Sequence, residues 1–402
     1  MARTGRAAVN AAAVDDARAI ALRTFLDTQE KARPGEVLLL NGDGAPRVDI
    51  NVIPTGAISL DLAIGAGGFP RGRIIELYGP ESGGKTTLAL EVAKRCQDEG
   101  GNVGFVDAEH ALNRELCQHI GIDEARFVIS QPDSGEKAID IVSEMIRSGA
   151  FDIVIVDSVA AMVPEAELDA ETTQQFMGLH ARLMSKFMRR VAGDVSNTGT
   201  MLVLINQVRK DLGAYGAPDT TTGGRAIRFY ASLRIEVRTS SSKKIERNGQ
   251  VVGVTVKATV KKNKVGPPFR QAEYDVIFGQ GIEGSGALLD VAEATGVIER
   301  RGASYTYVTT GERIAIGKDN AKQLLSSEEG TDLRSRITDE VYAVMRGRIP
   351  ASGSDPEGAD AEVPAASKAS ADNDGEVDEE AGEGSGGRPE ESESIEDLMA
   401  VG

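Results

Sequence analysis

The segment that most constrains the fold reads Gly-Pro-Glu-Ser-Gly-Gly-Lys-Thr, at residues 79–86. It fits the phosphate-binding loop pattern of a glycine, four free positions and Gly-Lys-Thr. An aliphatic run at residues 73–78 predicts a buried strand entering the loop, and residues 87–94 predict the helix leaving it. A chance match in a glycine-rich loop would lack that strand and helix. The sequence therefore predicts a nucleoside triphosphate site at this turn, where the helix N-terminus favours an anion.

Each residue type in this loop has a chemical reason. Glycines let backbone N–H groups close around phosphate oxygens with no Cβ in the way, Lys85 places a positive charge on the β- and γ-phosphates, and the Thr86 hydroxyl can bind Mg²⁺. The candidate nucleotide-binding residues are Gly79, Pro80, Glu81, Ser82, Gly83, Gly84, Lys85, Thr86, Thr87 and Asp157.

Composition excludes several classes of protein. No apolar run approaches ~20 residues, so we expect no membrane span. Residues 1–14 lack the hydrophobic core of a signal peptide. The two cysteines and three histidines form no disulfide or metal-binding pattern. We therefore expect a protein of the reducing cytoplasm.

The net charge of −17 is concentrated at one end of the chain. Residues 351–402 hold 16 acidic and two basic residues, a net of −14, which leaves −3 for the rest. This tail has few large apolar side chains, so we expect it to be disordered. The remainder is close to neutral, and its overall charge does not exclude a nucleic-acid partner.

The order of patterns along the chain predicts an α/β fold. Residues 14–31 read as an amphipathic helix, followed by a linker to about residue 70. Aliphatic runs then alternate with helical patterns, which is typical of a mostly parallel sheet covered by helices on both faces. Beyond residue 229, strands follow one another, with a hairpin turn at Asn248 and Gly249. The expected divisions are a helix and linker at 1–50, an ATPase core at 51–283, a small C-terminal α/β domain at 284–350 and the acidic tail at 351–402.

Polar residues at the carboxyl ends of the predicted strands are where a ligand should bind. Asp157 ends one aliphatic run and can hold Mg²⁺ with Thr86, although a structural role for this acid is the alternative. Glu109 can orient and deprotonate water, a role for which Asp107 competes on sequence alone. Gln207 ends another run, and its amide can sense the γ-phosphate by hydrogen bonding.

Two long loops begin at the same end of the sheet, at residues 164–175 and 208–224. Loops of such length inside a compact core are usually functional. We therefore expect a second ligand whose binding depends on the nucleotide state.

Seven motifs occur in order between residues 50 and 345, at 79–86, 107–112, 156–161, 177–182, 220–224, 229–234 and 262–264. Together they resemble the RecA family of bacterial recombinases. The resemblance implies a P-loop NTPase (RecA-like) core with a central mostly parallel sheet, an N-terminal helical oligomerisation arm and a small C-terminal α/β domain. It also implies a DNA-dependent ATPase that forms helical filaments on single-stranded DNA, with ATP and Mg²⁺ at each interface.

The same resemblance implies homologous pairing with double-stranded DNA, strand exchange, and stimulated self-cleavage of LexA-type repressors in the DNA-damage response. Matching positions give the catalytic set Glu109, Lys85, Gln207, Lys262 and Lys264, of which the last two would reach the neighbouring subunit's γ-phosphate. Phe229 would plug into the adjacent subunit. The implied DNA-binding residues are Met177, Arg182, Ser185, Arg189, Leu212, Gly223 and Gly224.

The chain departs from the family pattern at a few positions. Leu116 stands where a tyrosine usually stacks on adenine, and Phe278 matches a second aromatic near the base. The alternatives are a ring-forming P-loop DNA motor or helicase, a non-enzymatic DNA-coating protein and a small-molecule kinase. The loop motif at 220–224 and the small C-terminal unit argue against the helicase, and Glu109 with Asp157 argue against a silent site.

Overall fold

The computed structural model describes residues 4–33, 37, 50–168, 178–209, 220–247 and 249–347. Met177, Leu212, residues 34–36 and 38–49 of the predicted linker, and the acidic tail at 351–402 lie outside these residues. The expectations that fall on them therefore stay expectations.

The N-terminal helix α1 (Thr4–Ala32) is longer than the predicted 14–31. Its described side chains include Ile20, Leu22 and Phe25, which are exposed to 65%, 49% and 51%. Exposed apolar side chains of this size on one helix are typical of a contact surface.

The predicted linker is wrong for residues 50–70. This stretch forms β1 (Val52–Ile53), α2 (Ile58–Ile64) and β2 (Phe69–Pro70). Helix α2 buries Ile58, Leu60 and Ile64, and Gly65 closes it in the left-handed conformation, with φ of 84°. The glycines and prolines that suggested a linker are the caps and turns of short elements.

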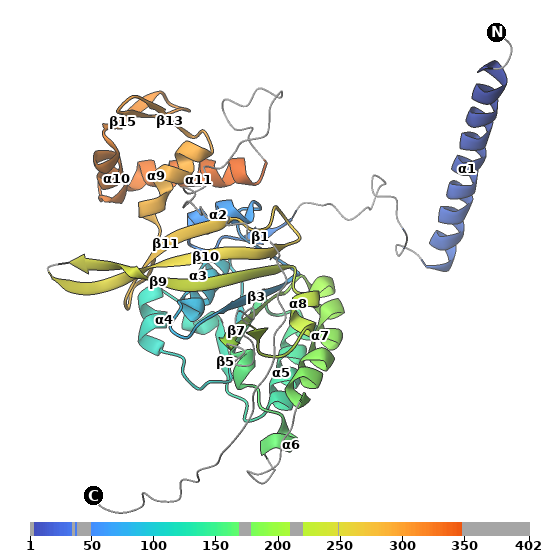
Figure 1. The fold of residues 1–402 in the computed structure, drawn as a ribbon, viewed down its shortest axis with the longest axis horizontal. Coiled ribbons are helices and arrows are strands. Elements are labelled where there is room, and N and C mark those ends of the chain that lie inside the picture. The colour runs from blue at the N-terminus through green and yellow to red at the C-terminus, as the bar shows by residue number, and fades with distance from the viewer. Residues whose placement is uncertain are drawn as a thin grey trace, which may run out of the picture. The chain divides into compact units, whose positions relative to one another are not determined.

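One large sheet forms the centre of the core (Figure 1), in the order β12-β11-β10-β9-β3-β7-β6-β4-β5, with β8 beside β7. The strands from β9 to β5 in that order are parallel, whereas β9 to β12 pair antiparallel. The mostly parallel α/β core is thus confirmed. The bounds are β3 (Ile74–Gly79), β4 (Val103–Asp107), β5 (Phe127–Ser130), β6 (Ile153–Asp157), β7 (Met201–Arg209), β8 (Thr220–Thr221), β9 (Leu233–Arg247), β10 (Gln250–Asn263), β11 (Gln271–Ile277) and β12 (Gly281–Glu283).

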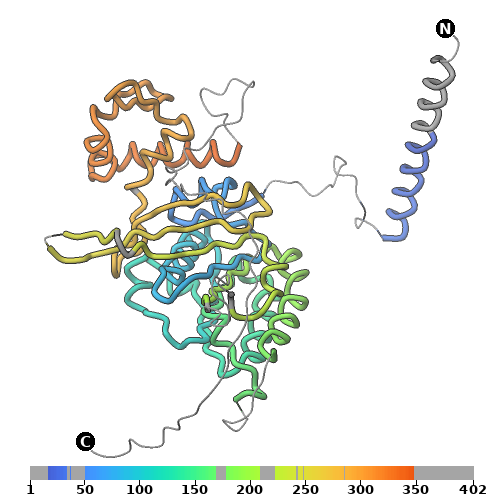
Figure 2. Tube along the Cα trace, viewed as in Figure 1, coloured from blue at the N-terminus to red at the C-terminus, as the bar shows by residue number. Residues whose placement is uncertain are grey.

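Helices cover both faces because alternate strand residues point to opposite sides of the sheet. Ile153 and Ile155 of β6 join one buried cluster, with α3 (Lys85–Asp98) and α4 (Arg114–Ile120). Val154 and Val156 join the other cluster, with α5 (Gly135–Ser148) and α7 (Leu179–Thr198). Figure 2 follows the same path as a tube, in which α4 (cyan) and α7 (green) lie on either side of the parallel strands.

Strand β5 departs from this pattern. It lies at the end of the sheet order, and its Val128 and Ile129 are each 47% exposed. The aliphatic run at residues 126–130 predicts a strand correctly, but the edge position leaves its apolar side chains without a covering helix.

The C-terminal segment packs around Leu289, Tyr305 and Ile337, in a buried cluster to which Ile58 of α2 also contributes. It contacts the larger core through Tyr342, whose hydroxyl donates to Asp61 Oδ2 at 2.6 Å. The bounds are α9 (Ser285–Ala294), β13 (Ile298–Arg301), β14 (Ser304–Tyr307), β15 (Glu312–Ile316), α10 (Lys318–Ser326) and α11 (Thr331–Met345).

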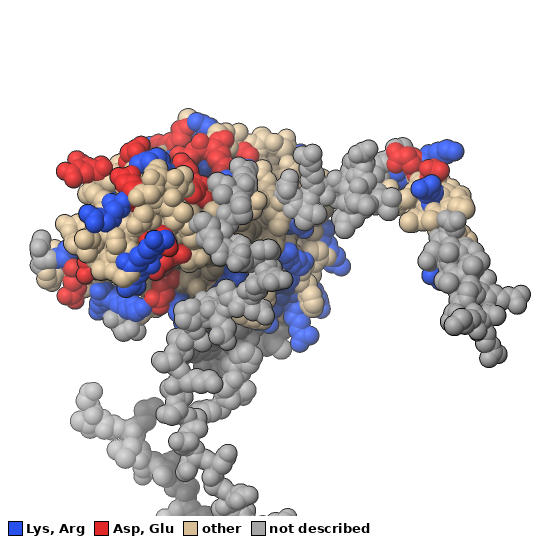
Figure 3. Space-filling view, turned by 90° about the horizontal axis from the view of Figure 1, so that it is seen from above, with Lys and Arg blue, Asp and Glu red and all other residues tan. Residues whose placement is uncertain are grey.

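Seen from above (Figure 3), acidic side chains gather along one edge of the molecule, and basic side chains are interspersed elsewhere on this face. Charge alone therefore marks no DNA surface on this face.

Four short helices complete the described fold. Their bounds are Glu124–Arg126 and Val159–Ala161 for the two 3₁₀ turns, with α6 (Glu165–Leu168) and α8 (Ala226–Tyr230). Across the described residues, no helix combines the length and the apolar character needed to cross a membrane.

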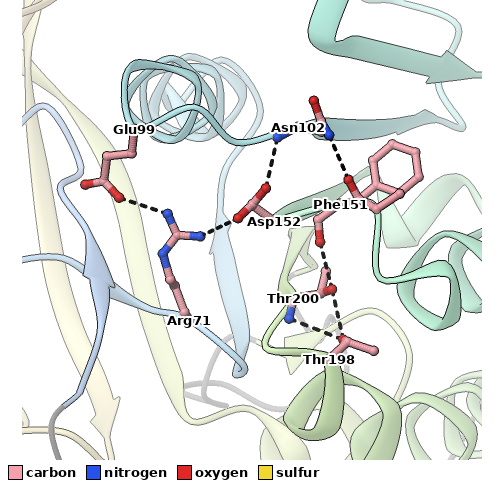
Figure 4. Close-up of polar contacts among 8 residues, drawn as sticks. Arg71, Glu99, Asn102, Phe151, Asp152, Thr198 and Thr200 are labelled. Carbon is pink, nitrogen blue, oxygen red and sulfur yellow. Dashed lines mark hydrogen bonds and ion pairs between the residues drawn. The ribbon is translucent and has the colours of Figure 1, made fainter.

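A polar network ties together the amino ends of the parallel strands (Figure 4). Arg71 forms ion pairs with Glu99 at 2.8 Å and with Asp152 at 2.9 Å. Asp152 also accepts a hydrogen bond from the Asn102 N–H at 3.0 Å, and Thr200 donates to the Phe151 carbonyl at 2.8 Å. This amino-end network joins the turn before β3 to the starts of β4, β6 and β7.

Candidate nucleotide site and nucleic-acid interface

The loop at residues 79–86 can be built only with glycine at its tightest points. A Cβ on Gly79 would lie 2.0 Å from the Val237 carbonyl oxygen. A Cβ on Gly83 would lie 3.0 Å from the carbonyl oxygens of Pro80 and Val237. Gly84 begins helix α3 with φ of 86°, which favours glycine. The backbone N–H groups at this helix start are therefore free to face an anion.

Lys85 is the buried cation of the loop, with 7% of its surface exposed. Its Nζ donates hydrogen bonds to the carbonyls of Gly79 at 3.2 Å and Pro80 at 2.6 Å. Burial lowers the pKa of Lys85, and the nearby carboxylates of Asp157 and Glu109 oppose that shift. Phosphate oxygens would be stronger partners for this ammonium than neutral carbonyls, so the site fits a nucleotide.

Thr86 and Asp157 form the oxygen-rich side of the site. The Thr86 hydroxyl donates to Asp157 Oδ2 at 2.6 Å. Burial raises the pKa of Asp157 to about 6, against the hydrogen bond from Thr86, which lowers it. A hydroxyl and a carboxylate are ligands that Mg²⁺ accepts, and Mg²⁺ takes its other ligands from phosphate and water. This pair therefore fits a nucleotide-bound Mg²⁺.

Glu109 contacts two groups from other strand ends. Its Oε1 accepts hydrogen bonds from Gln207 Nε2 at 3.1 Å and from the Ser158 hydroxyl. Asp107 has other partners: its carboxylate accepts hydrogen bonds from the N–H groups of Ala111 and Leu112 and from Gln131 Nε2. The structure thus gives Asp107 the role of holding its turn and leaves Glu109 exposed at the site.

A cavity of about 230 Å³ opens beside the loop. Its apolar wall includes Val254, Val256 and Phe278, with Phe278 57% exposed. Leu116 does not line this cavity and packs instead against the core cluster. A purine would therefore meet aliphatic side chains and one aromatic ring there.

Arg182, Ser185 and Arg189 lie along α7 on the side away from its buried residues. Both arginines are exposed, and the Ser185 hydroxyl donates to the Ala181 carbonyl at 2.9 Å. Gly224 lies against this helix, since a Cβ on it would be 3.1 Å from Ala181 Cβ. The structure therefore brings the exposed stripe of α7 and the turn at residues 222–225 together.

Lys262 and Phe229 form a separate group away from the loop. Lys262 Nζ donates to the carbonyls of Arg228 at 2.6 Å and Phe229 at 3.1 Å. The Phe229 side chain is 71% exposed. Lys264 is near them, because its N–H donates to the Ser232 carbonyl at 2.9 Å.

Sequence reasoning missed Ser158 as a site residue. Its position directly after Asp157 at a strand end was the available signal, but nothing in the pattern showed that its hydroxyl meets Glu109. Thr239 was missed as well, since it reaches the cavity only through the long β9 strand.

Comparison with known proteins identifies the family. The model described as RecA N-terminal domain matches residues 20–283, and the RecA C-terminal domain model matches residues 286–346. The chain belongs to the RecA family. Protein RecA of Syntrophus aciditrophicus is 50% identical over 73% of this chain and 84% of its own. Protein RecA of Delftia acidovorans is 41% identical over 90% of this chain and 97% of its own.

Among solved structures, the crystal structure of the RadB recombinase covers 58% of this chain and 99% of its own at 21% identity and a TM-score of 0.44. The RecA relatives extend over most of both chains, so this RecA-family protein is an ATP-binding recombinase whose ATPase depends on DNA.

Proposed function

We propose that this chain assembles as a helical filament on single-stranded DNA and drives pairing and strand exchange with homologous double-stranded DNA. ATP and Mg²⁺ are bound at the interface between successive subunits. The observation that carries this proposal is that the implied catalytic groups fall into two sets. One lies at the phosphate loop, and the other, Lys262 with Lys264, is held by backbone carbonyls near the exposed Phe229 ring.

The distance along β10 separates the two sets. Val256 lines the nucleotide cavity, and Lys262 lies six residues further along the same strand. At ~3.3 Å per residue this is roughly 20 Å from the cavity wall at Val256. We assign Lys262 and Lys264 to the γ-phosphate held by a neighbouring subunit.

The first set holds the nucleotide and the attacking water. Lys85 contacts the β- and γ-phosphates, and Thr86 with Asp157 holds Mg²⁺, which neutralises phosphate charge. Glu109 orients and deprotonates water, and Ser158 and Gln207 fix its carboxylate. Gln207 also senses the γ-phosphate, which links nucleotide state to the segment after β7.

DNA lies along the exposed stripe of α7. Arg182 and Arg189 contact phosphates, as do Ser185 and the backbone of Gly223 and Gly224. Met177 and Leu212 lie outside the described residues, and we assign them as apolar wedges between bases. The mixed polar and backbone contacts suit binding without sequence preference.

Self-assembly uses the exposed apolar side chains. Phe229 inserts into the adjacent subunit, and α1 docks on a neighbour through Ile20, Leu22 and Phe25. We assign residues 51–283 as the catalytic core and 284–350 as a small C-terminal domain, which packs on α2 through Ile58. We also assign the chain to the cytoplasm and to stimulated cleavage of LexA-type repressors.

Two measurements test the proposal. ATPase rates are compared with and without a poly-dT oligonucleotide, and electron microscopy is done with DNA and a non-hydrolysable ATP analogue. We expect DNA to raise the rate and open helical filaments to form. Closed six-fold rings would favour a ring-forming motor, and a rate insensitive to DNA would contradict the proposal outright.

A further inference from the structure

A polar cluster at the centre of the sheet is formed by Glu76, Asn206 and Arg234. Glu76 and Asn206 are fully buried, and Arg234 is 9% exposed. Glu76 on β3 lies opposite Arg234 on β9, and β7 carries Asn206 on the other side of β3. A buried carboxylate is costly unless it is paired and hydrogen-bonded. In this Glu76 cluster, Arg234 and Asn206 supply those partners, so what else the two residues contact decides what the cluster can do.

Asn206 connects the cluster to the turn beside α7. Its Nδ2 donates to Glu76 Oε1 at 3.0 Å and to the Thr222 carbonyl at 3.0 Å. Its Oδ1 accepts from the Gln207 N–H at 2.9 Å. Both amide hydrogens and the carbonyl of this side chain are therefore engaged. Thr222 immediately precedes Gly223 and Gly224. The Asn206 carboxamide is therefore hydrogen-bonded directly to that turn.

Arg234 connects the cluster to the second catalytic set. Its Nε pairs with Glu76, and its guanidinium lies 4.6 Å from the centre of the Tyr78 ring, next to Gly79. On the other side, Arg234 lies opposite Lys262 in the register of β9 and β10. The Glu76 cluster thus has Thr222 at one end and the strand position of Lys262 at the other.

We propose that Asn206, Glu76 and Arg234 are positioning residues that couple the Gly223–Gly224 turn to Lys262. This inference rests on the proposed function, because it assumes DNA at the turn and Lys262 acting on a neighbour. When DNA shifts the turn, Asn206 has no spare donor, so it must either lose its bond to Thr222 or follow Thr222 away from Glu76. Following Thr222 alters how Glu76 is shared with Arg234.

The turn leaves one of its own polar groups unpaired. The Thr222 hydroxyl is buried and has no hydrogen-bond partner among the described residues. An unpaired buried hydroxyl costs free energy, so a shifted turn that pairs this group is favoured by one hydrogen bond. A two-state turn is what a coupling route requires.

The test uses the full chain with Asn206→Ala and Arg234→Lys, which keeps the charge beside Glu76. ATPase is measured with and without poly-dT, together with binding of a fluorescent ATP analogue and the thermal midpoint. We expect the DNA-stimulation ratio to fall about tenfold, within the usual range of coupling between sites, while ATP affinity changes less than about twofold. Asn102→Ala is the matched control, because it removes an asparagine side chain bonded to Ala150 at the opposite end of the sheet and should keep the wild-type ratio.

A double variant tests whether both residues act on one route. Asn206→Ala combined with Lys262→Ala should lose no more than Lys262→Ala alone, because either change interrupts the same coupling. An unchanged ratio in Asn206→Ala would overturn the inference, as would additive losses with Lys262→Ala. Loss of folding or ATP binding in both single variants would also overturn it, since the cluster would then only support the fold. A wild-type chain without DNA stimulation would instead overturn the proposed function, and the inference with it.

Discussion

The two ends of the parallel strands differ in how their polar groups are paired. At the amino ends, Arg71 holds two carboxylates, Glu99 and Asp152, in direct ion pairs. At the carboxyl ends, Lys85 is held by neutral carbonyls, and Asp157 accepts from a hydroxyl. The amino-end network is complete within the chain, whereas the nucleotide end uses weaker partners that a phosphate and a cation can replace.

This difference teaches how one sheet supports both stability and chemistry. Opposite charges that are already paired stabilise the fold but have little left to offer a ligand. Charges held by neutral groups remain available for stronger partners. Substitutions at the amino ends should therefore change stability, and substitutions at the carboxyl ends should change activity.

Lys85→Ala should produce the largest effect. We expect ATP hydrolysis to fall by at least about 100-fold, because the charge on the β- and γ-phosphates is lost. The thermal midpoint should not fall, since the removed ammonium is buried on neutral partners. Phosphate release and thermal melts measure both. Lys94→Ala on the same helix removes a lysine paired with Asp98 and should leave hydrolysis intact. Normal hydrolysis by Lys85→Ala would contradict the nucleotide site.

Lys262→Ala should produce the next largest effect. We expect DNA-stimulated ATPase to fall about tenfold, while ATP binding by an isolated subunit changes less than about twofold. The control is Lys261→Ala, one residue away on β10, which pairs with Glu236 at 3.0 Å. If the isolated subunit loses ATP binding as much as the polymer loses activity, Lys262 acts within its own chain.

Arg71→Ala should affect stability alone. Its partners Glu99 and Asp152 are about 40% exposed, so solvent screens the pairs and we expect a loss of about 1 kcal/mol in the free energy of unfolding. Urea melts measure this, and the ATPase of the folded protein should not change. The control Arg114→Ala breaks a more exposed pair with Glu124 and should cost less. If Arg71→Ala instead lost much of its ATPase activity at unchanged stability, the amino ends of the strands would not be a purely structural region.

Titration of Asp157 should give the smallest effect, a change with pH in the Mg²⁺ concentration that nucleotide binding requires. With its pKa raised by burial to about 6, about half the carboxylates are neutral at pH 6, so twice as much Mg²⁺ should be needed as at pH 8. Because the folded pKa lies above the unfolded value of 3.8, the metal-free protein gains stability from this group below 3.8 and loses it as pH rises through 6. Mg²⁺ titrations of nucleotide binding test the first effect. The control is Asp157→Asn, in which only the nucleotide phosphates still titrate. Identical Mg²⁺ curves for this variant and the wild-type chain would disprove the assignment of Asp157 to Mg²⁺.

Much of the core could be predicted because its strands are continuous aliphatic runs, as in residues 153–157. The hairpin at Gly249 was also predicted, and Arg247 does pair with Gln250. Helix α2 was missed because it has only seven residues, between two glycines, which is too short for a repeating helical pattern of apolar residues to be recognised. The choice between Asp107 and Glu109 could not be made from sequence, because it depends on which N–H groups a turn aims at each carboxylate.

The alternation along β6 has a consequence for how the protein can evolve. A one-residue slip of this strand would exchange the two buried clusters and turn Asp157 away from Thr86 in the same event. An insertion or deletion there would therefore be removed by loss of folding before its effect on hydrolysis mattered. Selection for a stable chain therefore also keeps this carboxylate aimed at its hydroxyl, and we expect changes of length to be tolerated in the connections between strands rather than within β6.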